Sequence, residues 1–536
     1  MRRHLLTWAA ISIPVYLLAG SPLAAQPAIS AVLSNYSYTL PNLPNYGIAP
    51  GSLFIIFGTG MAQPGSQASP LQDPSKALPQ TLNGASVSVT VNGVISQSAL
   101  YYATPTQIAA VLPSSTPLGT LAEVKVTFGG ATSQQFNTTV AQSAFGFDTY
   151  YGTGSGMAAV TDNFTGRLIT PASSAQPGET IVFWGSGVGA DTNNNDVDPP
   201  AHFDNLNFIT QLFIGGVSVP IGYQGRSHYQ GVDQVDVTLP ANVPTGCAVS
   251  VVAVGGSGNS AMVSNTVTMP VSAGGGGCID PLQPVSSTEA AALAGHALVN
   301  LGSLSLSQIT NTTGTSRMAG AQFVSIPGAS LFPYLGNTLP SLGSCVVYQQ
   351  VSVPPVNPYQ LEGLNPGTIS VTGAGGTQAL SALPSTPGLY TAALTAGFLP
   401  PSAASYTFAG LGGPGVQAFS TPVDFPNPLD WTNSSAAGAI TRAEGLTVNW
   451  TGGDASTYVQ ISGSASTVGA SVFFICDAPL SPATFTVPPS VLLALPAAGG
   501  GVQVSSFTNP KSFSAAGLDF GYAASYVSTF VSTTYQ

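Results

Sequence analysis

The sequence predicts an all-β protein made of two tandem β-sandwiches and a larger C-terminal β-rich domain. The chain has 536 residues, too many for one hydrophobic core, so several domains are expected. It has 62 Gly and 44 Pro but only 5% charged residues, which is typical of many short strands joined by tight turns. Disorder is disfavoured because 44% of the residues are hydrophobic, enough to form cores.

An internal repeat divides the first half of the chain. Residues 50–60 recur as residues 177–187, and residues 106–113 recur as residues 233–240, both at an offset of 127 residues. The landmarks that keep this offset are Gly51 and Gly178, Gln107 and Gln234, and Pro113 and Pro240. We infer that one unit was duplicated and that its strand order was retained.

The first unit, residues 29–142, contains turn signals at the spacing of a β-sandwich. Residues 87–91 alternate Val with polar residues and end at Asn92-Gly93, the strongest short-range signal of a hairpin. The strands predicted in this unit are 51–58, 87–91, 100–103, 108–112, 124–128 and 136–140.

The second unit, residues 143–272, copies this pattern and adds a longer polar loop between Gly189 and Asn207. Its predicted strands are 181–184, 212–214, 217–223, 235–239, 249–254 and 265–269. Four consecutive glycines at 274–277 predict a flexible boundary to the third region.

Residues 280–536 form the C-terminal β-rich domain. The Ala-rich segment 288–297 predicts a short helix, and residues 488–495 predict one helical turn. The predicted strands are 368–372, 404–408, 446–450, 458–461, 472–476 and 485–487. The pattern leaves open whether this region is one large sandwich or two subdomains.

The N-terminus, residues 1–25, predicts a signal peptide. It has a positively charged start, an apolar stretch over residues 5–20 and a small-residue pair at Ala24-Ala25. A membrane anchor is disfavoured because the apolar stretch contains Pro14 and is shorter than the about 20 residues of a spanning helix. We therefore expect export through the general secretory pathway and a secreted or cell-surface location.

The net charge indicates which classes of partner are disfavoured, and the cysteines indicate whether the protein is exported to an oxidising compartment. The formal net charge is −11 and no basic patch is present, which argues against binding nucleic acid or an anionic membrane. An even number of cysteines in an exported chain favours disulfides, and three pairings are possible. The cysteines are Cys247, Cys278, Cys345 and Cys476. We favour the nearest pair, Cys247–Cys278, together with Cys345–Cys476; buried free thiols are the alternative.

Several motifs keep their order and spacing in both units. They are residues 49–52, 57–60, 82–87, 91–93 and 101–113 in the first unit, and 177–178, 185–189, 215–217 and 234–237 in the second. This set resembles the Solibacter-type domain of acidobacterial secreted proteins, which is related to IPT/TIG immunoglobulin-like modules. The resemblance covers about residues 29–272 and implies secretion and tandem immunoglobulin-like β-sandwiches. It implies no catalytic residues. Gly246-Cys247 and Cys278-x-Asp280 also resemble a cysteine pair of such chains.

The polar run 191–198 is the candidate metal site. Alternating Asp and Asn oxygens suit a hard cation such as Ca²⁺. The candidate ligands are Asp191, Asn193, Asn195 and Asp198. However, Asp196 stands where an EF-hand has Gly, and His202 stands where it has a bidentate Glu. A polar turn closed by its own hydrogen bonds is therefore the main alternative.

Two further features could bind a ligand. The loop 225–229 combines Arg, His and Tyr, which could hold a carboxylate or a sugar, but a solvated hairpin loop with a structural Tyr is the favoured interpretation. Tryptophans can stack on sugars, and the candidates are Trp184, Trp431 and Trp450. Trp184 and Trp450 lie within apolar alternation, which predicts core packing instead.

No H-E-x-x-H, G-x-S-x-G or G-x-x-x-x-G-K motif occurs, so the corresponding enzyme classes lack their usual signatures. No catalytic and no cofactor-binding residue is nominated. We predict a non-enzymatic structural or adhesion-type protein of the cell surface or matrix, whose partner is a surface protein or a glycan. The alternatives are an extracellular carbohydrate-binding protein and a secreted hydrolase with its site in residues 280–536.

Overall fold

The computed structural model describes residues 26–536 except 68–72, 74, 257–260, 332–333, 336–339, 351–360, 387 and 401. The predicted signal peptide, residues 1–25, lies outside the described residues. Strands dominate the described chain and most neighbouring strands are antiparallel, so the all-β prediction is confirmed. In this part of the chain no helix has the length and apolar character needed to cross a membrane.

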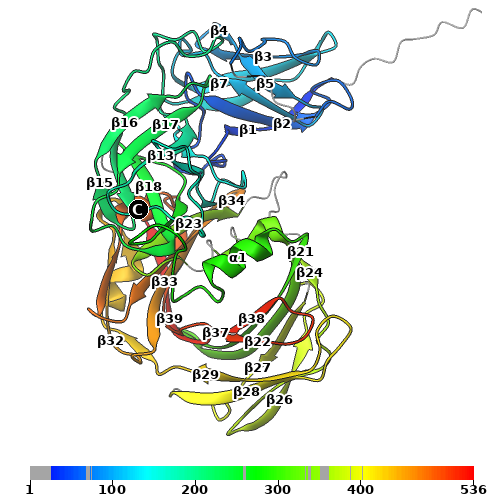
Figure 1. Ribbon diagram of the computed structural model, residues 1–536, viewed down its shortest axis with the longest axis vertical. Helices are drawn as coiled ribbons and strands as arrows, with labels where there is room; N and C mark the ends of the chain where they lie inside the picture. The colour runs from blue at the N-terminus through cyan, green and yellow to red at the C-terminus, as the bar shows by residue number, and fades with distance from the viewer. Residues whose placement is uncertain are drawn as a thin grey trace, which may run out of the picture.

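The first unit is a sandwich of two sheets at the top of Figure 1. Its strands are β1 (Ala28–Ser34), β2 (Leu53–Thr59), β3 (Ala85–Val91), β4 (Val94–Gln97), β5 (Ala99–Ala103), β6 (Gln107–Val111), β7 (Gly119–Phe128), β8 (Ala131–Thr132) and β9 (Phe136–Val140). One sheet has the order β1-β2-β6-β5 and the other β4-β3-β7-β8, with β9 also on β7. The predicted alternation faces the core: Val87 and Val89 are fully buried opposite Val126 and Val124.

The second unit repeats this topology. Its strands are β10 (Gly146–Phe147), β11 (Gly156–Met157), β12 (Val160–Asp162), β13 (Thr180–Ser186), β14 (Ile209–Ile214), β15 (Val217–Val219), β16 (Ile221–Arg226), β17 (Asp233–Thr238), β18 (Gly246–Gly255), β19 (Met262–Val263) and β20 (Val267–Val271). The sheets are β10-β13-β17-β16, with β12 on β13, and β11-β20-β18-β14-β15, with β19 on β18. The repeat's offset of 127 residues separates the first and last residues of β2 from those of β13. The same offset separates β7 from β18.

The C-terminal region is built on one large curved sheet. Its elements are α1 (Ser287–Ala294), β21 (Leu298–Asn311), β22 (Gly314–Pro327), η2 (Gly328–Ser330), β23 (Ser344–Gln350), β24 (Glu362–Gly363), β25 (Ile369–Gly373), β26 (Gly376–Ala382), β27 (Leu389–Ala393), β28 (Ala404–Gly410), β29 (Phe419–Phe425), β30 (Leu429–Trp431), η3 (Ser434–Gly438), β31 (Ala439–Ile440), η4 (Arg442–Glu444), β32 (Leu446–Gly452), β33 (Thr457–Thr467), β34 (Ala470–Pro479), β35 (Thr484–Val487), α3 (Pro489–Leu492), β36 (Gly499–Thr508), β37 (Lys511–Phe513), β38 (Phe520–Ala523) and β39 (Tyr526–Tyr535).

Within the described residues this sheet runs β23-β34-β33-β36-β39-β21-β22-β27-β26-β25-β28-β29, and α1 lies over its curved surface (Figure 1). A separate small sheet, β30-β32-β35, packs against the β33–β34 end. One apolar core surrounds Ile461 and Phe474, and another surrounds Phe323 and Phe408. The region therefore has separate cores on one continuous sheet.

The longest hairpin of this region escaped the strand prediction. β21 pairs with β22 along its whole length, from Leu298 opposite Pro327 to Asn311 opposite Gly314. The turn closes because Asn311 Oδ1 accepts hydrogen bonds from the N–H groups of Thr313 and Gly314. β21 does alternate Leu304 and Leu306 with Ser305 and Ser307, whereas small Gly, Ser and Ala residues dilute the apolar pattern in β22.

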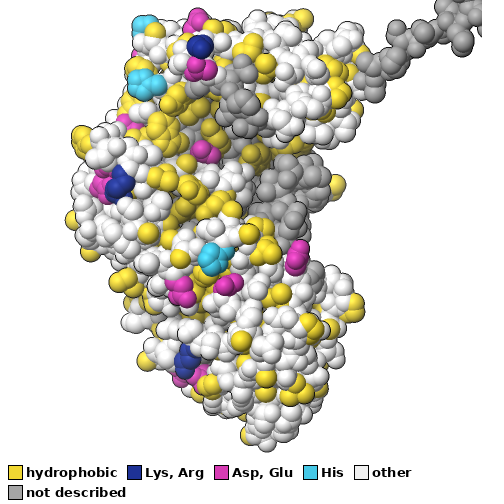
Figure 2. Space-filling model, turned by 45° about the vertical axis from the view of Figure 1, so that its right-hand side comes forward, with side chains coloured by type: hydrophobic (Ala, Val, Ile, Leu, Met, Phe, Trp, Pro, Cys, Tyr) yellow, Lys and Arg dark blue, Asp and Glu magenta, His cyan; other side chains and the backbone are white. Residues whose placement is uncertain are grey.

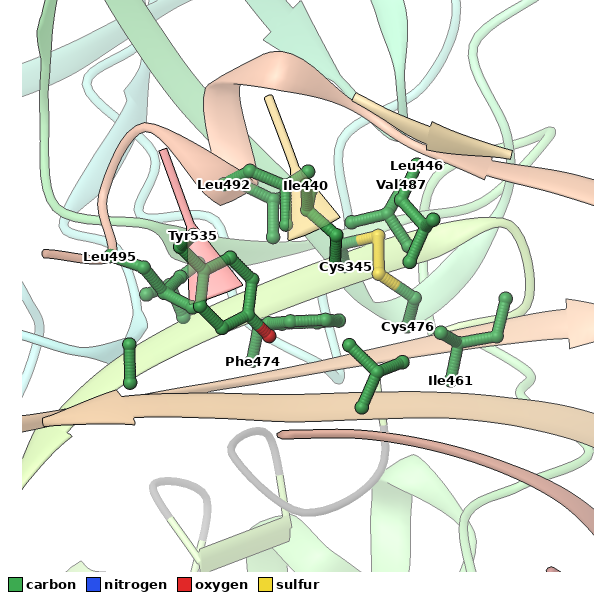
Figure 3. Packing of buried hydrophobic residues seen from close by; sticks show 14 of the residues in the cluster. Cys345, Ile440, Leu446, Ile461, Phe474, Cys476, Val487, Leu492, Leu495 and Tyr535 are labelled. Carbon is green, nitrogen blue, oxygen red and sulfur yellow. A yellow bond between two sulfur atoms is a disulfide. The ribbon is translucent and has the colours of Figure 1, made fainter. Parts of the chain in front are cut away.

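The structure forms both disulfides that were favoured. Cys247 bonds Cys278, and Cys345 bonds Cys476, with no free cysteine among the described residues. Cys345 on β23 lies directly opposite Cys476 on β34. Figure 3 shows this second bridge inside the apolar core, beside Leu446, Val487 and Ile461.

The three parts contact one another through buried groups. Leu40 and Leu43, from the segment after β1, are buried in the core of the C-terminal region. Unit 2 joins the same region where Ala248 donates its N–H to Ser341 Oγ at 2.9 Å. The glycine run is not a free linker, because the Ser174 N–H donates to the Gly276 carbonyl at 2.7 Å.

Candidate functional site

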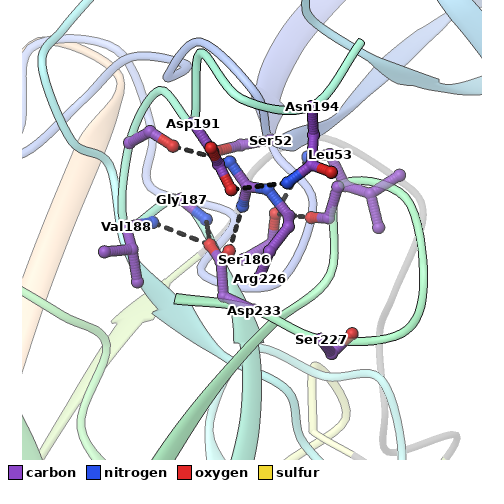
Figure 4. Close-up of polar contacts among 12 residues, drawn as sticks. Ser52, Leu53, Ser186, Gly187, Val188, Asp191, Asn194, Arg226, Ser227 and Asp233 are labelled. Atoms are coloured by element: carbon purple, nitrogen blue, oxygen red, sulfur yellow. Dashed lines mark hydrogen bonds and ion pairs between the residues drawn. The ribbon is translucent and has the colours of Figure 1, made fainter. Parts of the chain in front are cut away.

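The junction between units 1 and 2 is built around a buried ion pair. Arg226, the last residue of β16, faces Asp233, the first residue of β17, and their side chains are 1% and 0% exposed. The carboxylate also accepts the N–H groups of Gly187 and Val188, each at 2.8 Å, and Arg226 donates to the Gly189 carbonyl at 2.7 Å (Figure 4). Both expectations for the 225–229 loop, ligand binding and solvent exposure, are therefore wrong for Arg226.

Electrostatics at this pair set two effects against each other. Burial raises the pKa of the Asp233 carboxyl because the charged form loses its water. The guanidinium of Arg226 and the two main-chain N–H groups act to lower that pKa, because they stabilise the carboxylate. Removing either partner would leave an uncompensated charge or donor in the interior.

Polar groups of unit 1 continue this network. The Leu53 N–H donates to Ser186 Oγ at 2.8 Å, and Ser186 in turn donates to the Gly231 carbonyl at 2.6 Å. Tyr101 donates its hydroxyl to the Gln230 carbonyl at 2.8 Å. These bonds connect β2 and β5 of unit 1 to the strand ends of unit 2.

The polar loop of unit 2 docks on unit 1 through a residue that was not nominated. Asp196, with a left-handed φ of 60°, accepts the N–H of Ser114 at 2.6 Å and its hydroxyl at 3.1 Å. The Asp191 N–H donates back to Ser114 Oγ at 3.0 Å. Burial raises the pKa of Asp196. The only signal in the sequence that could have identified Asp196 is that it stands where an EF-hand has Gly.

The four predicted calcium ligands make hydrogen bonds among themselves and with neighbouring groups. Asp191 accepts the Asn193 N–H at 3.0 Å and a neighbouring asparagine amide at 2.7 Å. Asn195 accepts the Asp198 N–H at 2.8 Å and donates to the Asp198 carboxylate at 2.7 Å. Among the described residues no group of three or more His, Cys, Asp or Glu is arranged to hold a metal. These bonds are those of the polar-turn alternative, and the calcium site stays a prediction.

In the rest of the 225–229 loop only His228 and Tyr229 are exposed, whereas Gly225 and Ser227 are buried. The Tyr229 side chain is 43% exposed, and its N–H donates to Ser227 Oγ at 3.1 Å. His228 is exposed and packs edge-on against Phe203 at 4.7 Å between ring centroids. The structure does not bring His228 together with the buried Arg226.

The tryptophans separate into two classes. Trp450 is 2% exposed and lies opposite Trp431, which is 4% exposed, so the core prediction for Trp450 is confirmed. Trp184 is half-buried on the outer face of its sheet, because its neighbour Phe183 faces the core. The core prediction for Trp184 is wrong. Its indole N–H donates to Thr161 Oγ1 at 3.1 Å.

Polar groups flank Trp184 on that outer face. Gln234 on β17 lies opposite it on one side, and on the other the Asp148 N–H donates to the Trp184 carbonyl at 2.8 Å. Burial raises the pKa of Asp148 to about 7. Burial, with Asp148 nearby, also raises the pKa of Tyr38 to about 12. A partly exposed indole beside a carboxyl and an amide could contact a sugar.

A cavity of about 630 Å³ lies between unit 2 and the C-terminal region. Phe213, Val252 and Val254 line it from unit 2, and Phe485 and Leu493 line it from the C-terminal region. No Asp, Glu, Lys, Arg or His is among the described residues that line it.

The buried acids of the C-terminal region lie outside this cavity. Asp477 is 0% exposed and accepts the Gln460 amide at 3.0 Å, and burial raises its pKa well above the usual range. Asp280 accepts the Ser341 hydroxyl at 2.5 Å and the Cys247 N–H at 3.1 Å. Asp280 therefore connects the first disulfide to the segment before β23.

Charged side chains do not gather on the surface in Figure 2. The few Lys and Arg side chains on that face are isolated, and each lies beside an acidic one. Lys511 pairs with Asp424, and Lys76 pairs with Asp73. This surface offers no patch of positive charge for a polyanion.

No protein-family model and no curated protein matches the chain. Solved structures resemble it only weakly. The full extracellular region of Plexin A4 shares 9% identity over 85% of this chain, with a TM-score of 0.12, and the chain spans 35% of that region. The N-terminal eight Ig domains of Down Syndrome Cell Adhesion Molecule share 10% identity, covering 91% of this chain and 47% of that one, with a TM-score of 0.12. A surface glycan-binding protein of Prevotella bryantii shares 10% identity, covering 65% and 70%, with a TM-score of 0.15. These scores carry no argument about function, and the Solibacter-type resemblance stays a prediction.

Proposed function

We propose that the protein is a non-enzymatic structural or adhesion-type component of the cell surface or the extracellular matrix. The observation that supports this most directly is the joining of all three parts by buried contacts. Asp196 and Ser186 anchor unit 2 to Ser114 and Leu53 of unit 1. Leu40 and Leu43 extend from unit 1 into the C-terminal core. Buried contacts of this kind suit a module that holds a fixed shape between a surface and a partner.

An extracellular location is part of the proposal. Two disulfides form within the described chain, and disulfides persist in oxidising compartments. The low content of charged residues leaves few sites for proteases that cleave at Lys or Arg. We also propose membership of the Solibacter-type family, on the repeated motifs of units 1 and 2.

Localisation and gene deletion in the producing organism test this function together. An antibody against the folded chain should label intact cells or their matrix, and deletion should reduce attachment of cells to one another or to a surface. Restoring the gene should restore attachment. Recovery of the chain from the cytosol, or unchanged attachment after deletion, would contradict the proposal.

Glycan binding is the second candidate, favoured by the outer face around Trp184. This indole is half-buried, lies opposite Gln234 and neighbours Asp148. Aromatic rings that stack on a sugar and polar groups that bind its hydroxyls are the usual elements of such a site. A glycan array probed with the full chain and with Trp184→Ala tests it. Equal signals from both proteins would remove this face from consideration.

A further inference from the structure

One sheet face of unit 2 is an interface within the chain. Strand β18 directs alternate side chains into the core of unit 2, and the side chains between them point outward. The outward residues, each no more than 7% exposed, are Ala248, Ser250, Val252 and Val254. The Ser250 N–H donates to Ser344 Oγ at 3.2 Å, and the two valines pack with Leu493. This face therefore holds the C-terminal region.

The corresponding face of unit 1 is open to solvent. The repeat's offset of 127 residues places Leu121, Glu123, Lys125 and Thr127 of β7 where β18 has those four residues. Leu121 is 74% exposed. Ile95 on β4 is 64% exposed and lies in one row with Thr90 and Glu123. Figure 1 shows β3 and β4 at the end of the molecule opposite the large sheet. The described part of the chain thus leaves two large apolar side chains uncovered on this face.

The charges on this face of unit 1 complement themselves. Between Lys76 and Asp148 the sequence has only two charged residues, Glu123 and Lys125. They lie two residues apart on β7, point to the same side and pair at 3.5 Å, with side chains 39% and 37% exposed. An exposed pair of this kind contributes little to folding. When two such faces meet with their β7 strands antiparallel, Glu123 of each copy lies opposite Lys125 of the other.

The dimensions of packed sheets allow this contact. Two sheets that pack face to face lie about 10 Å apart, a gap that a Glu and a Lys side chain can bridge. The smaller Ser88 and Thr90 on β3 lie opposite Lys125 and Glu123 and leave room beside them. Covering Leu121 and Ile95 removes exposed apolar surface from water, which favours association.

We propose that this face of unit 1 binds the same face of a second copy of the chain, through an isologous contact centred on the two β7 strands. The role of the contact rests on the adhesion function proposed above, because two cells that display the protein would be joined through unit 1. The dimer itself can be measured without cells. A single sheet face is small for a permanent interface, so the association is reversible.

Sedimentation equilibrium of the full chain tests the contact. The wild type should form a reversible dimer. Leu121→Asp would bury an unpaired charge at the interface and should weaken the dimer at least about tenfold. The matched control is Leu411→Asp, because Leu411 is 75% exposed but belongs to the C-terminal region. It should leave the affinity within about twofold of the wild type.

A pair of charge reversals identifies the face that is used. Glu123→Lys gives a face with two positive charges, and Lys125→Glu gives a face with two negative charges. Each variant alone should dimerise at least about tenfold more weakly, because like charges meet. A mixture of the two, with a fluorescent label on one, should form a heterodimer within about threefold of the wild-type affinity. Both side chains are partly exposed, so thermal melts of the variants should match the wild type.

Three results would overturn the proposal. The wild type could stay monomeric up to about 1 mM, Leu411→Asp could weaken the dimer as much as Leu121→Asp, or the mixed charge variants could bind no better than each variant alone. The adhesion function is tested separately. A dimer in solution with unchanged attachment after gene deletion would contradict adhesion alone, whereas a monomeric chain that still supports attachment would contradict only the self-association.

Discussion

Replacing Arg226 with Met tests whether the junction depends on a buried charge pair. The substitution keeps much of the side-chain volume but removes the guanidinium opposite Asp233 and the donor to the Gly189 carbonyl. Asp233 would keep only the N–H groups of Gly187 and Val188. Breaking a buried pair by removing one partner costs about 3–5 kcal/mol. At about 3 °C per kcal/mol for a domain of this size, the calorimetric transition of unit 2 should fall by about 10 °C.

Two controls show whether the loss comes from burial. Lys511→Met removes one partner of the exposed pair with Asp424, whose side chains are 63% and 42% exposed, and should cost no more than about 1 kcal/mol. The double variant Arg226→Met with Asp233→Asn removes both charges and should recover at least about 2 kcal/mol of the loss. A change of less than about 1 kcal/mol in Arg226→Met, or a double variant as unstable as the sum of the single variants, would refute the reasoning.

Two further predictions concern pH and the fit of the junction. Burial raises the pKa of Asp148 to about 7, so the carboxyl binds its proton more tightly in the folded than in the unfolded state. The protonated carboxyl therefore contributes fully to the free energy of unfolding below about pH 4, and this contribution is lost as the pH rises to about 7. Urea unfolding in that range should show a falling free energy of unfolding, and Asp148→Asn should make the fall less steep because the other buried carboxyls still titrate. Asp162→Asn should leave the slope above about pH 5 unchanged, because the pKa of Asp162 is lowered. Gly51→Ala should open the junction and raise the radius of gyration in X-ray scattering, because the new Cβ, at a φ of +74°, would clash with the guanidinium of Arg226 and lie 3.2 Å from the Gly189 carbonyl oxygen, both in unit 2. Its repeat counterpart Gly178 has a φ of +86° and open space, so Gly178→Ala should show the backbone strain alone; equal effects of the two variants would contradict a steric cause.

Much of the fold could be predicted because its signals are local. The alternation over residues 87–91 correctly predicted a strand, which is β3 in the structure. Strands β7 and β18 begin and end at positions separated by the offset of the repeat. Proximity in sequence also favoured the bridge from Cys247 to Cys278. Alternation and turn residues act over a few neighbours, so their physical meaning does not depend on the rest of the chain.

The candidate site was harder to predict because its residues act through distant partners. The sequence placed Arg226 in a loop. It is buried because it pairs with Asp233 at the start of the next strand and because unit 1 packs against this end of unit 2. The sequence predicted Trp184 to lie in the core because its strand is apolar on both faces. A strand can be apolar on both faces when a neighbouring unit covers the second one.

The sequence by itself determined the all-β class, the duplicated unit and the strand order within each copy. Those features follow from alternation, turn chemistry and a retained spacing, which short segments encode. Only the tertiary structure decided how the parts are joined: Asp196 bonds Ser114 of the other unit, and Leu40 enters a core more than 300 residues away in the chain. Burial and pairing across such separations depend on which surfaces meet, and no local pattern specifies that meeting.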